Sequence, residues 1–141
     1  MPAQSPGHWF RSTRFRVEPG EDAETNTGIH GRQLAAWIAA ELRTRGHPKA
    51  EESPEDWGWA VVCSETPFRL FVACGNLMDC DRNASATQPA DEILWHCYAA
   101  ADGPFFAKLR NIDVAGPVAA LDALLADILG TDADIVIVEA P

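Results

Sequence analysis

Two stretches of the chain repeat apolar residues at the spacing of an amphipathic helix. Asn26 precedes the first stretch and Gly46 follows it, which suits a helix N-cap and the residue after a helix end. The pattern predicts a helix over residues 27–45 that is capped by Asn26, and a second helix over residues 115–129 that is ended by Gly130. The apolar stripes are Leu34, Ile38 and Leu42 in the first helix, and Val118, Leu121, Leu125 and Ile128 in the second.

The other apolar runs are short and bounded by turn residues, which is typical of β-strands. Runs 57–63 and 68–75 are joined by SETP, a connection of hairpin length. The last run, DIVIVEA, is nearly continuous in β-branched residues, so it is predicted to be buried on both faces. The six predicted strands are residues 12–18, 57–63, 68–75, 92–99, 105–110 and 134–140.

The order of these elements is β-α-β-β-β-β-α-β, with polar loops predicted at 47–56 and 76–91. Four consecutive strands favour an antiparallel meander, and two amphipathic helices need an apolar surface to cover. We therefore expect an α+β fold of two layers, a mainly antiparallel twisted sheet with two packed helices. No break in composition divides residues 1–141, so they are expected to form a single domain, with residues 1–11 as a loose N-terminal segment.

Composition narrows the classes of function. The chain has 21 acids against 11 lysines and arginines, a net charge of −10, which argues against binding to nucleic-acid phosphates. Charge is uneven, because residues 111–141 hold six acids and no base, whereas residues 11–16 hold three arginines. The sequence contains no run of about 18 apolar residues, so no membrane span is predicted. The start lacks the apolar region of a signal peptide. We therefore expect a cytoplasmic protein.

The four cysteines agree with a reducing compartment. Cys63, Cys74, Cys80 and Cys97 show no CxxC spacing, and three of them lie in strand-like apolar runs. Buried free thiols are the structural expectation for such positions.

Trp57 and Trp59 flank a glycine at the start of the 57–63 run. In a regular strand the two indoles share one face with Val61 and Cys63, and the small residues Gly58 and Ala60 lie on the other. If helices cover the indole face, both tryptophans belong to the core. If that face is uncovered, they form an exposed aromatic patch that calls for a partner or ligand.

Two motifs carry a resemblance. The segments ETNTGIHGRQLAAWIAAELRTRG and PEDWGWAV, with a later strand that ends in CGN, resemble a group of uncharacterised small bacterial proteins. That group shares an acidic loop, a Thr-Asn-x-Gly helix start and a Glu-Asp-Trp-Gly strand start. Thr27 stands where the group has proline, a natural first helical residue. The resemblance covers residues 18–76 and implies a bacterial source and a shared fold, without an activity.

The segment TNTGIHGR, residues 25–32, is the first candidate ligand site. A helix N-terminus presents free N–H groups and a partial positive charge. Asn26, Gly28, Gly31 and Arg32 could therefore hold a carboxylate or phosphate, with Trp57 and Trp59 beside them. The structural alternative is a capped helix whose glycines allow close packing, and the segment lacks the Gly-Lys-Ser/Thr ending of a P-loop.

Other patterns for chemistry are incomplete. Asp79, Asp81 and Asn83 match the first three ligand positions of a calcium loop, but its glycine and its final glutamate are both alanine here. Neighbours on a strand face opposite ways, so His96 cannot activate Cys97 directly. Zinc ligation through Cys74, Cys80 and His96 lacks the usual spacing. The adjacent acids Glu55 and Asp56 diverge and have no second acid as partner. The sequence names no catalytic residue and predicts no metal site and no cofactor.

These patterns favour a non-catalytic, protein-binding module. Its partner is expected to be another protein, or a second copy through a sheet edge, with no nucleic acid and no membrane involved. The small size and the acidic charge suit an immunity-like protein that neutralises a basic partner. The alternative is a protein that binds a small molecule or anion, or an enzyme, that uses residues 25–32 with Trp57 and Trp59.

Overall fold

The computed structural model describes residues 3–76, 89–102 and 112–141. Within these ranges the strands form one antiparallel sheet in the order β3-β4-β5-β6-β2-β7, and β1 also pairs with β6. The strands are β1 (Ala3–Gln4), β2 (His8–Arg11), β3 (Glu51–Glu55), β4 (Gly58–Ser64), β5 (Arg69–Asn76), β6 (Trp95–Asp102) and β7 (Val136–Val138). The helices are α1 (Arg32–Arg43) and α4 (Ala115–Thr131), with short 3-10 turns η1 (Glu21–Ala23) and η2 (Ala90–Glu92).

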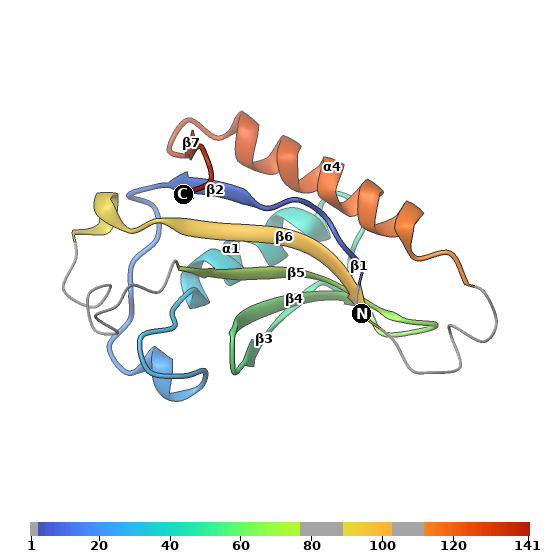
Figure 1. The fold of residues 1–141 in the computed structure, drawn as a ribbon, viewed down its shortest axis with the longest axis horizontal. Helices are drawn as coiled ribbons and strands as arrows, with labels where there is room; N and C mark the ends of the chain where they lie inside the picture. The colour runs from blue at the N-terminus through green and yellow to red at the C-terminus, as the bar shows by residue number, and fades with distance from the viewer. Residues whose placement is uncertain (1–2, 77–88, 103–111) are drawn as a thin grey trace.

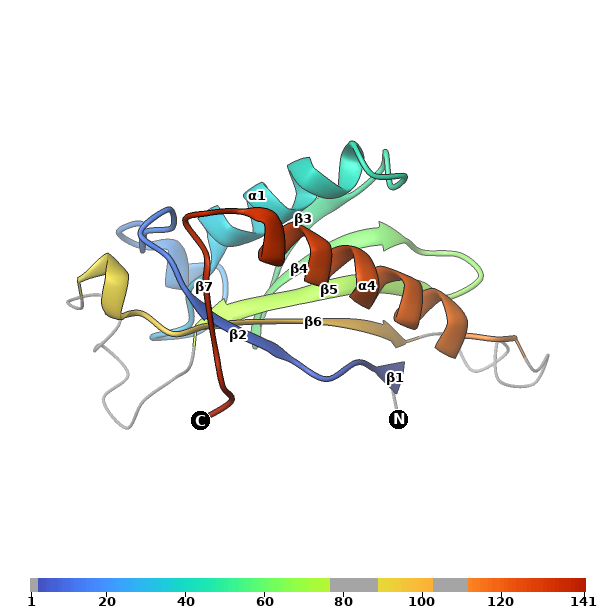
Figure 2. The ribbon, with the colours of Figure 1, turned by 90° about the horizontal axis from the view of Figure 1, so that it is seen from above.

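Both long helices lie on the same face of the sheet (Figures 1 and 2). Helix α1 packs on β3 and β4, while α4 packs on β6 and β1. The predicted α+β class is thus confirmed, and the described strands between the two helices are β3, β4, β5 and β6. None of the helices in the described ranges has both the length and the apolar character that crossing a bilayer requires.

The main core lies between the helices and this face of the sheet. All the apolar residues predicted to face the sheet are buried there: Leu34, Ile38, Leu42, Val118, Leu121, Leu125 and Ile128. Phe10, Phe15 and Trp95 fill the end of the core near the start of α1, with ring centroids 6.2 to 6.4 Å apart around Phe15. The helical periodicity therefore identified the contact faces of both helices correctly.

The strands on either side of the first helix differ from prediction: residues 12–18 are not a strand, and residues 51–55 of the predicted loop are one. Residues 12–18 form a turn and an extended segment outside the sheet, because the Ser12 hydroxyl accepts the N–H of Arg14 and bends the chain. The preceding residues are in the sheet as β1 and β2, so residues 3–11 do not form the loose segment that the sequence predicts. Residues 51–55 form the edge strand β3 in place of a loop, and Pro54 is tolerated because an edge strand leaves one side unpaired.

The ends of the first helix also differ from prediction. Helix α1 begins at Arg32, five residues after the predicted start, because Gly28 and Gly31 have positive φ angles of 81° and 148°. Gly46, with φ of 103°, follows the helix end as predicted, and the N–H groups of Arg45 and His47 both donate to Leu42 O.

Strand β7 is not buried on both faces, which corrects the prediction for DIVIVEA. Val136 and Ile137 are 59% and 53% exposed, and β7 pairs only with β2 among the described strands. A run of β-branched residues is as compatible with a short edge strand as with a central one. The predicted strand 105–110 lies outside the described residues.

Shortening a core side chain tests the helix contact. We expect Ile38→Ala to lower the free energy of unfolding by about 2–5 kcal/mol, because apolar contacts are lost and a cavity remains. Ala40→Gln, on the exposed side of the same helix, serves as the matched control and should change stability by less than about 0.5 kcal/mol. Urea denaturation followed by circular dichroism measures both values. Equal effects of the two substitutions would contradict the facing of α1.

Candidate functional site

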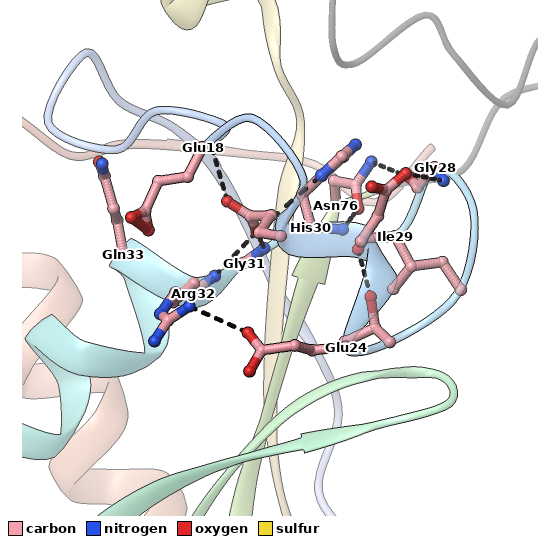
Figure 3. Close-up of polar contacts among 12 residues, drawn as sticks. Glu18, Glu24, Gly28, Ile29, His30, Gly31, Arg32, Gln33 and Asn76 are labelled. Carbon is pink, nitrogen blue, oxygen red and sulfur yellow. Dashed lines mark hydrogen bonds and ion pairs between the residues drawn. The ribbon is translucent and has the colours of Figure 1, made fainter.

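The start of α1, where Figure 3 shows Gly31 and Arg32, is occupied by the carboxylate of Glu21. Oε1 of Glu21 accepts the backbone N–H groups of Gly31 at 2.7 Å and Arg32 at 3.2 Å. The other oxygen, Oε2, accepts the N–H of Glu18 at 2.7 Å. Glu21 is only 3% exposed, so this interaction takes place inside the fold. The positive end of α1 therefore already has a negative group as its partner.

The local sequence explains why Glu21 reaches the helix. Gly20, with φ of 80°, turns the chain into η1, and η1 carries Glu21 under the first turn of α1. The N-cap residue of α1 is Gly31, which has no side chain to offer. A Cβ on Gly31 would meet Gly75 Cα at 3.4 Å and the Trp59 ring at 3.5 Å. A carboxylate from elsewhere in the chain thus replaces the usual side-chain cap.

Asn26 does not cap α1, which corrects the sequence prediction. Its Oδ1 accepts the N–H of Thr27 at 3.0 Å, and its backbone oxygen accepts the N–H of Ile29 at 2.9 Å, so it closes a separate turn. Another asparagine supports this loop. Asn76 accepts the N–H of His30 at 2.8 Å and donates to Gly28 O at 3.1 Å. A cross-loop contact of this kind has no local signature in the sequence.

Arg32 is also engaged within the protein. Its Nη1 lies 2.9 Å from Glu24 Oε2, and its guanidinium lies 5.6 Å from the centroid of the Trp59 ring. The structure therefore brings Gly31, Arg32 and Trp59 together, as predicted. It leaves Asn26 in the exposed turn and directs Trp57 away from this cluster.

His30, like Glu21 and Asn76, is a residue of this region that sequence reasoning missed. It is 2% exposed, and neither ring nitrogen has a hydrogen-bond partner among the residues that the structure describes. Its Nδ1 lies 3.9 Å from Glu21 Oε1, beyond hydrogen-bond distance. A buried polar pair therefore underlies the start of α1. Only the folding of η1 back onto the helix produces it, so no spacing in the sequence indicates it.

Trp57 and Trp59 lie on opposite sides of the sheet. Trp59 is buried in the main core under the helices, whereas Trp57 is 45% exposed and packs on Phe71 with 6.1 Å between ring centroids. Residues 56 and 57 form the tight turn between β3 and β4, so Trp57 is not in the strand. Gly58 makes the reversal possible, because φ is 150° and a Cβ there would meet Cys74 O at 2.6 Å. The predicted common face therefore holds for Trp59, Val61 and Cys63, but not for Trp57.

The face of the sheet opposite the helices carries several rings, which we call the aromatic face. Trp9 stacks on His96 at 3.9 Å between centroids, and His96 lies 5.3 Å from Tyr98. The aromatic face comprises Trp9, Trp57, Val62, Phe71, His96 and Tyr98, with Ala60, Ala73 and Ala100 between them. It crosses β2, β6, β5 and β4, and no helix of the described ranges covers it (Figure 2).

Partial burial changes the acid–base properties of two of these rings. Desolvation, with a smaller contribution from the nearby His8, lowers the pKa of His96. Desolvation, with a smaller contribution from Cys74, raises the pKa of Tyr98. Both shifts favour the neutral side chain at neutral pH, so these rings add apolar surface to the aromatic face.

An open hollow of about 640 Å³ adjoins one end of the aromatic face. Val62 and Arg69 line the hollow and also contact that face, since Arg69 lies 4.7 Å above the Phe71 ring. Its charged lining residues are Lys49, Glu51, Glu52, Glu65 and Arg69, and we call it the acidic hollow. Neither Asn26, Arg32 nor Trp57 lines it.

The remaining candidates have structural roles or lie outside the described residues. Glu55 is ion-paired with Arg69 at 2.5 Å, and Asp56 lies in the exposed turn. His96 and Cys97 face opposite sides of the sheet, as predicted. Cys80 and the calcium-like residues Asp79, Asp81 and Asn83 lie outside the described ranges. In the described part of the chain, no cluster of three or more His, Cys, Asp or Glu side chains could hold a metal ion.

Most acids of the C-terminal region have partners in other elements. Asp122 lies 2.7 Å from His8, and Asp127 is ion-paired with Arg45. Arg14 bridges Asp132 and Asp134 at 2.9 and 3.2 Å. Most acids of this segment are therefore already paired within the chain, which leaves fewer of them for a partner.

Comparisons with known proteins add no relative. No family model, no curated protein and no solved structure matches the chain. The resemblance of TNTGIHGR and PEDWGWAV to the bacterial group therefore stays a prediction, and function must be argued from the geometry.

Glu21 provides the sharpest test of the helix start. We expect Glu21→Ala to lower the free energy of unfolding by about 1–3 kcal/mol, because three backbone N–H groups, of which that of Gly31 is buried, lose their acceptor. Asn26→Ala should cost less than about 0.5 kcal/mol, because this exposed side chain only closes a local turn. Chemical denaturation measures both. A larger loss for Asn26→Ala than for Glu21→Ala would restore Asn26 as the cap.

Cys63 tests the prediction of buried thiols. Burial raises its pKa to about 12, so the reactive thiolate is scarcer at pH 8 by roughly three orders of magnitude than at an exposed thiol with the ordinary value. We expect iodoacetamide to label Cys63 slowly in the folded protein and rapidly in urea, as measured by peptide mass spectrometry. Labelling rates within tenfold of each other in the two states would contradict this.

Proposed function

We propose that this protein is a non-catalytic, protein-binding module that docks a basic partner protein on the aromatic face beside the acidic hollow. The observation that carries the proposal is the exposed Trp57, which packs on Phe71 of the aromatic face, while Arg69 above the same Phe71 ring lines the acidic hollow. Exposed tryptophans are enriched at interface hot spots, because a large rigid ring loses much apolar surface on docking.

The charge of this corner supports a basic partner. Around Trp57 and the hollow the acids outnumber the bases, with Glu51, Glu55, Asp56, Glu65 and Asp102 against Lys49 and Arg69. Arg69 is already engaged by Glu55 and Asp102. Glu51 and Glu65 line the hollow and form no ion pair with the described residues, so their carboxylates could accept an incoming lysine or arginine. Complementary charge steers association and selects among partners.

Surface shape favours a protein over a small ligand. Small-molecule sites are enclosed and mostly apolar, whereas the acidic hollow is open, polar and continuous with an aromatic surface. An interface with an aromatic centre and a polar rim is typical of protein–protein docking. The overall charge of −10 argues against a nucleic-acid partner.

The other candidate sites give less support to a binding role. The β3 edge carries Glu51, Glu52, Glu55 and Pro54, which are devices that prevent strand addition. The alternative of anion binding or catalysis at residues 25–32 has less support, because Glu21 fills the helix start and Glu24 pairs with Arg32.

From the acidity and the sequence resemblance we infer a cytoplasmic, immunity-like role in a bacterium. In this role the module neutralises a basic protein.

Site-specific photo-crosslinking tests this proposal. A benzoyl-phenylalanine at position 57, introduced in living cells, should capture a protein with an excess of lysine and arginine. The same group at position 40 of α1, or at position 136 of β7, serves as the control and should not capture that protein. Binding of the purified partner should weaken at least tenfold with Trp57→Ala and with Glu65→Lys, while the melting temperature changes little.

Each other outcome would overturn the proposal. Capture of the same partner from positions 40 or 136 would move the interface elsewhere. Capture of an acidic protein, or of a second copy of this chain, would contradict the charge argument. Unchanged affinity in both Trp57→Ala and Glu65→Lys would remove the aromatic face and the hollow from the interface.

A further inference from the structure

Two buried cysteines lie directly opposite each other in the centre of the sheet. Cys74 on β5 and Cys97 on β6 are register partners, and their Sγ atoms are 3.8 Å apart, with the Cys97 thiol donating to Cys74. Both side chains belong to the main core beneath the helices. Neither the sequence spacing nor the proposed function accounts for this pair.

The backbone shows which kind of cross-strand pair this is. Ser5 N–H donates to Ala99 O at 2.8 Å, and Ala99 N–H donates to Ser5 Oγ at 3.0 Å, so the backbone groups of Ala99 point away from β5. Cys97 is two residues from Ala99 and shares this direction. The oxygen of Cys74 points toward β4, because it would lie 2.6 Å from a Cβ on Gly58.

Cys74 and Cys97 therefore form a non-hydrogen-bonded pair. In such pairs the Cα atoms are about 4.5 Å apart and the side chains are closer than at the alternate positions. That separation lies within the range of roughly 4.4–6.8 Å that a disulfide spans. Side-chain rotations can then bring the sulfurs from 3.8 Å to bonding distance without a shift of register.

We propose that Cys74 and Cys97 are a disulfide-forming pair, and that oxidation by a low-molecular-weight disulfide joins β5 to β6. One cysteine thiolate attacks the small disulfide and releases one of its thiols. The second cysteine thiolate attacks the resulting mixed disulfide and releases the other. Two protein S–H bonds are lost and one S–S bond forms, while the small disulfide takes up two electrons and two protons and becomes two thiols.

Burial controls the rate of this reaction. Burial and the contact with Cys74 raise the pKa of the Cys97 thiol well above its ordinary value, so the folded pair reacts slowly. The oxidant reaches the thiols when the structure opens locally or before folding is complete. When β5 and β6 pair again, their register brings the two sulfurs together. The same two strands carry Phe71, Ala73 and Tyr98, so the bond would also tie together the centre of the aromatic face.

Oxidative refolding tests the proposal. The variant Cys63→Ala/Cys80→Ala, which keeps only this pair, is unfolded in reductant and refolded in mixtures of reduced and oxidised glutathione. Acid quenching, alkylation and mass spectrometry then count free thiols. We expect an unalkylated form lighter by two hydrogens, without a persistent glutathione adduct. Its melting temperature should exceed that of the reduced form by on the order of 10 °C and fall back with dithiothreitol.

The control is the same variant with Cys97→Ala, which has one thiol and can form at most a glutathione adduct, with no rise in melting temperature. Two free thiols or a stable adduct at the most oxidising ratio would overturn the proposal. So would a disulfide that lowers the melting temperature. If the double variant does not fold by circular dichroism, disulfide mapping of the unmodified chain should find Cys74 joined to Cys97, and any other pairing would contradict it.

Discussion

The arrangement of this protein depends on one constraint: a single sheet has two faces, and both long helices cover the same one. Alternate residues of β2, β4, β5 and β6 therefore belong either to the main core or to the aromatic face. Trp59, Cys74 and Cys97 lie beneath the helices, while Phe71, His96 and Tyr98 lie on the other side. Without helices on that side, large rings lie over the alanines of the central strands, and these rings make the surface that we assign to a partner.

A second, local constraint fixes α1 above the sheet. Gly31 has a φ angle of 148°, which residues with a side chain rarely adopt, so the helix begins at a residue that cannot cap it. The Glu21 carboxylate supplies the missing acceptor from η1, with His30 buried beside it. The internal carboxylate of Glu21 thus compensates for the glycine at the helix start, which has no side chain to accept the free N–H groups. The same carboxylate removes the anion site that a bare helix N-terminus would offer.

The sequence predicts features that depend on periodicity and misses those that depend on approach between distant segments. The stripes of α1 and α4 and the β4–β5 hairpin were predictable, because each is a local repeat. The side of Trp57 was not, because it depends on Gly58 avoiding the carbonyl of Cys74, a residue in the next strand. The β3 strand was missed because an edge strand can be entirely polar and contain proline. Of the candidate site residues, Gly31, Arg32 and Trp59 do meet, but Glu21, His30 and Asn76, which organise that cluster, carry no pattern.

The charge of the chain shows that function, too, depends on contacts between distant segments that the sequence does not reveal. The six acids of residues 111–141 suggest an acidic binding surface, yet four of them pair with His8, Arg14 and Arg45 from other elements. These contacts bring α4 and the segment before β7 into register with the N-terminal strands and with α1. The acids that remain for a partner are those around the β3–β4 turn and the hollow, where Arg69 is shared between Glu55 and Asp102. The net charge of the chain therefore overstates the charge available to a partner, because four of these six acids are already paired within the chain.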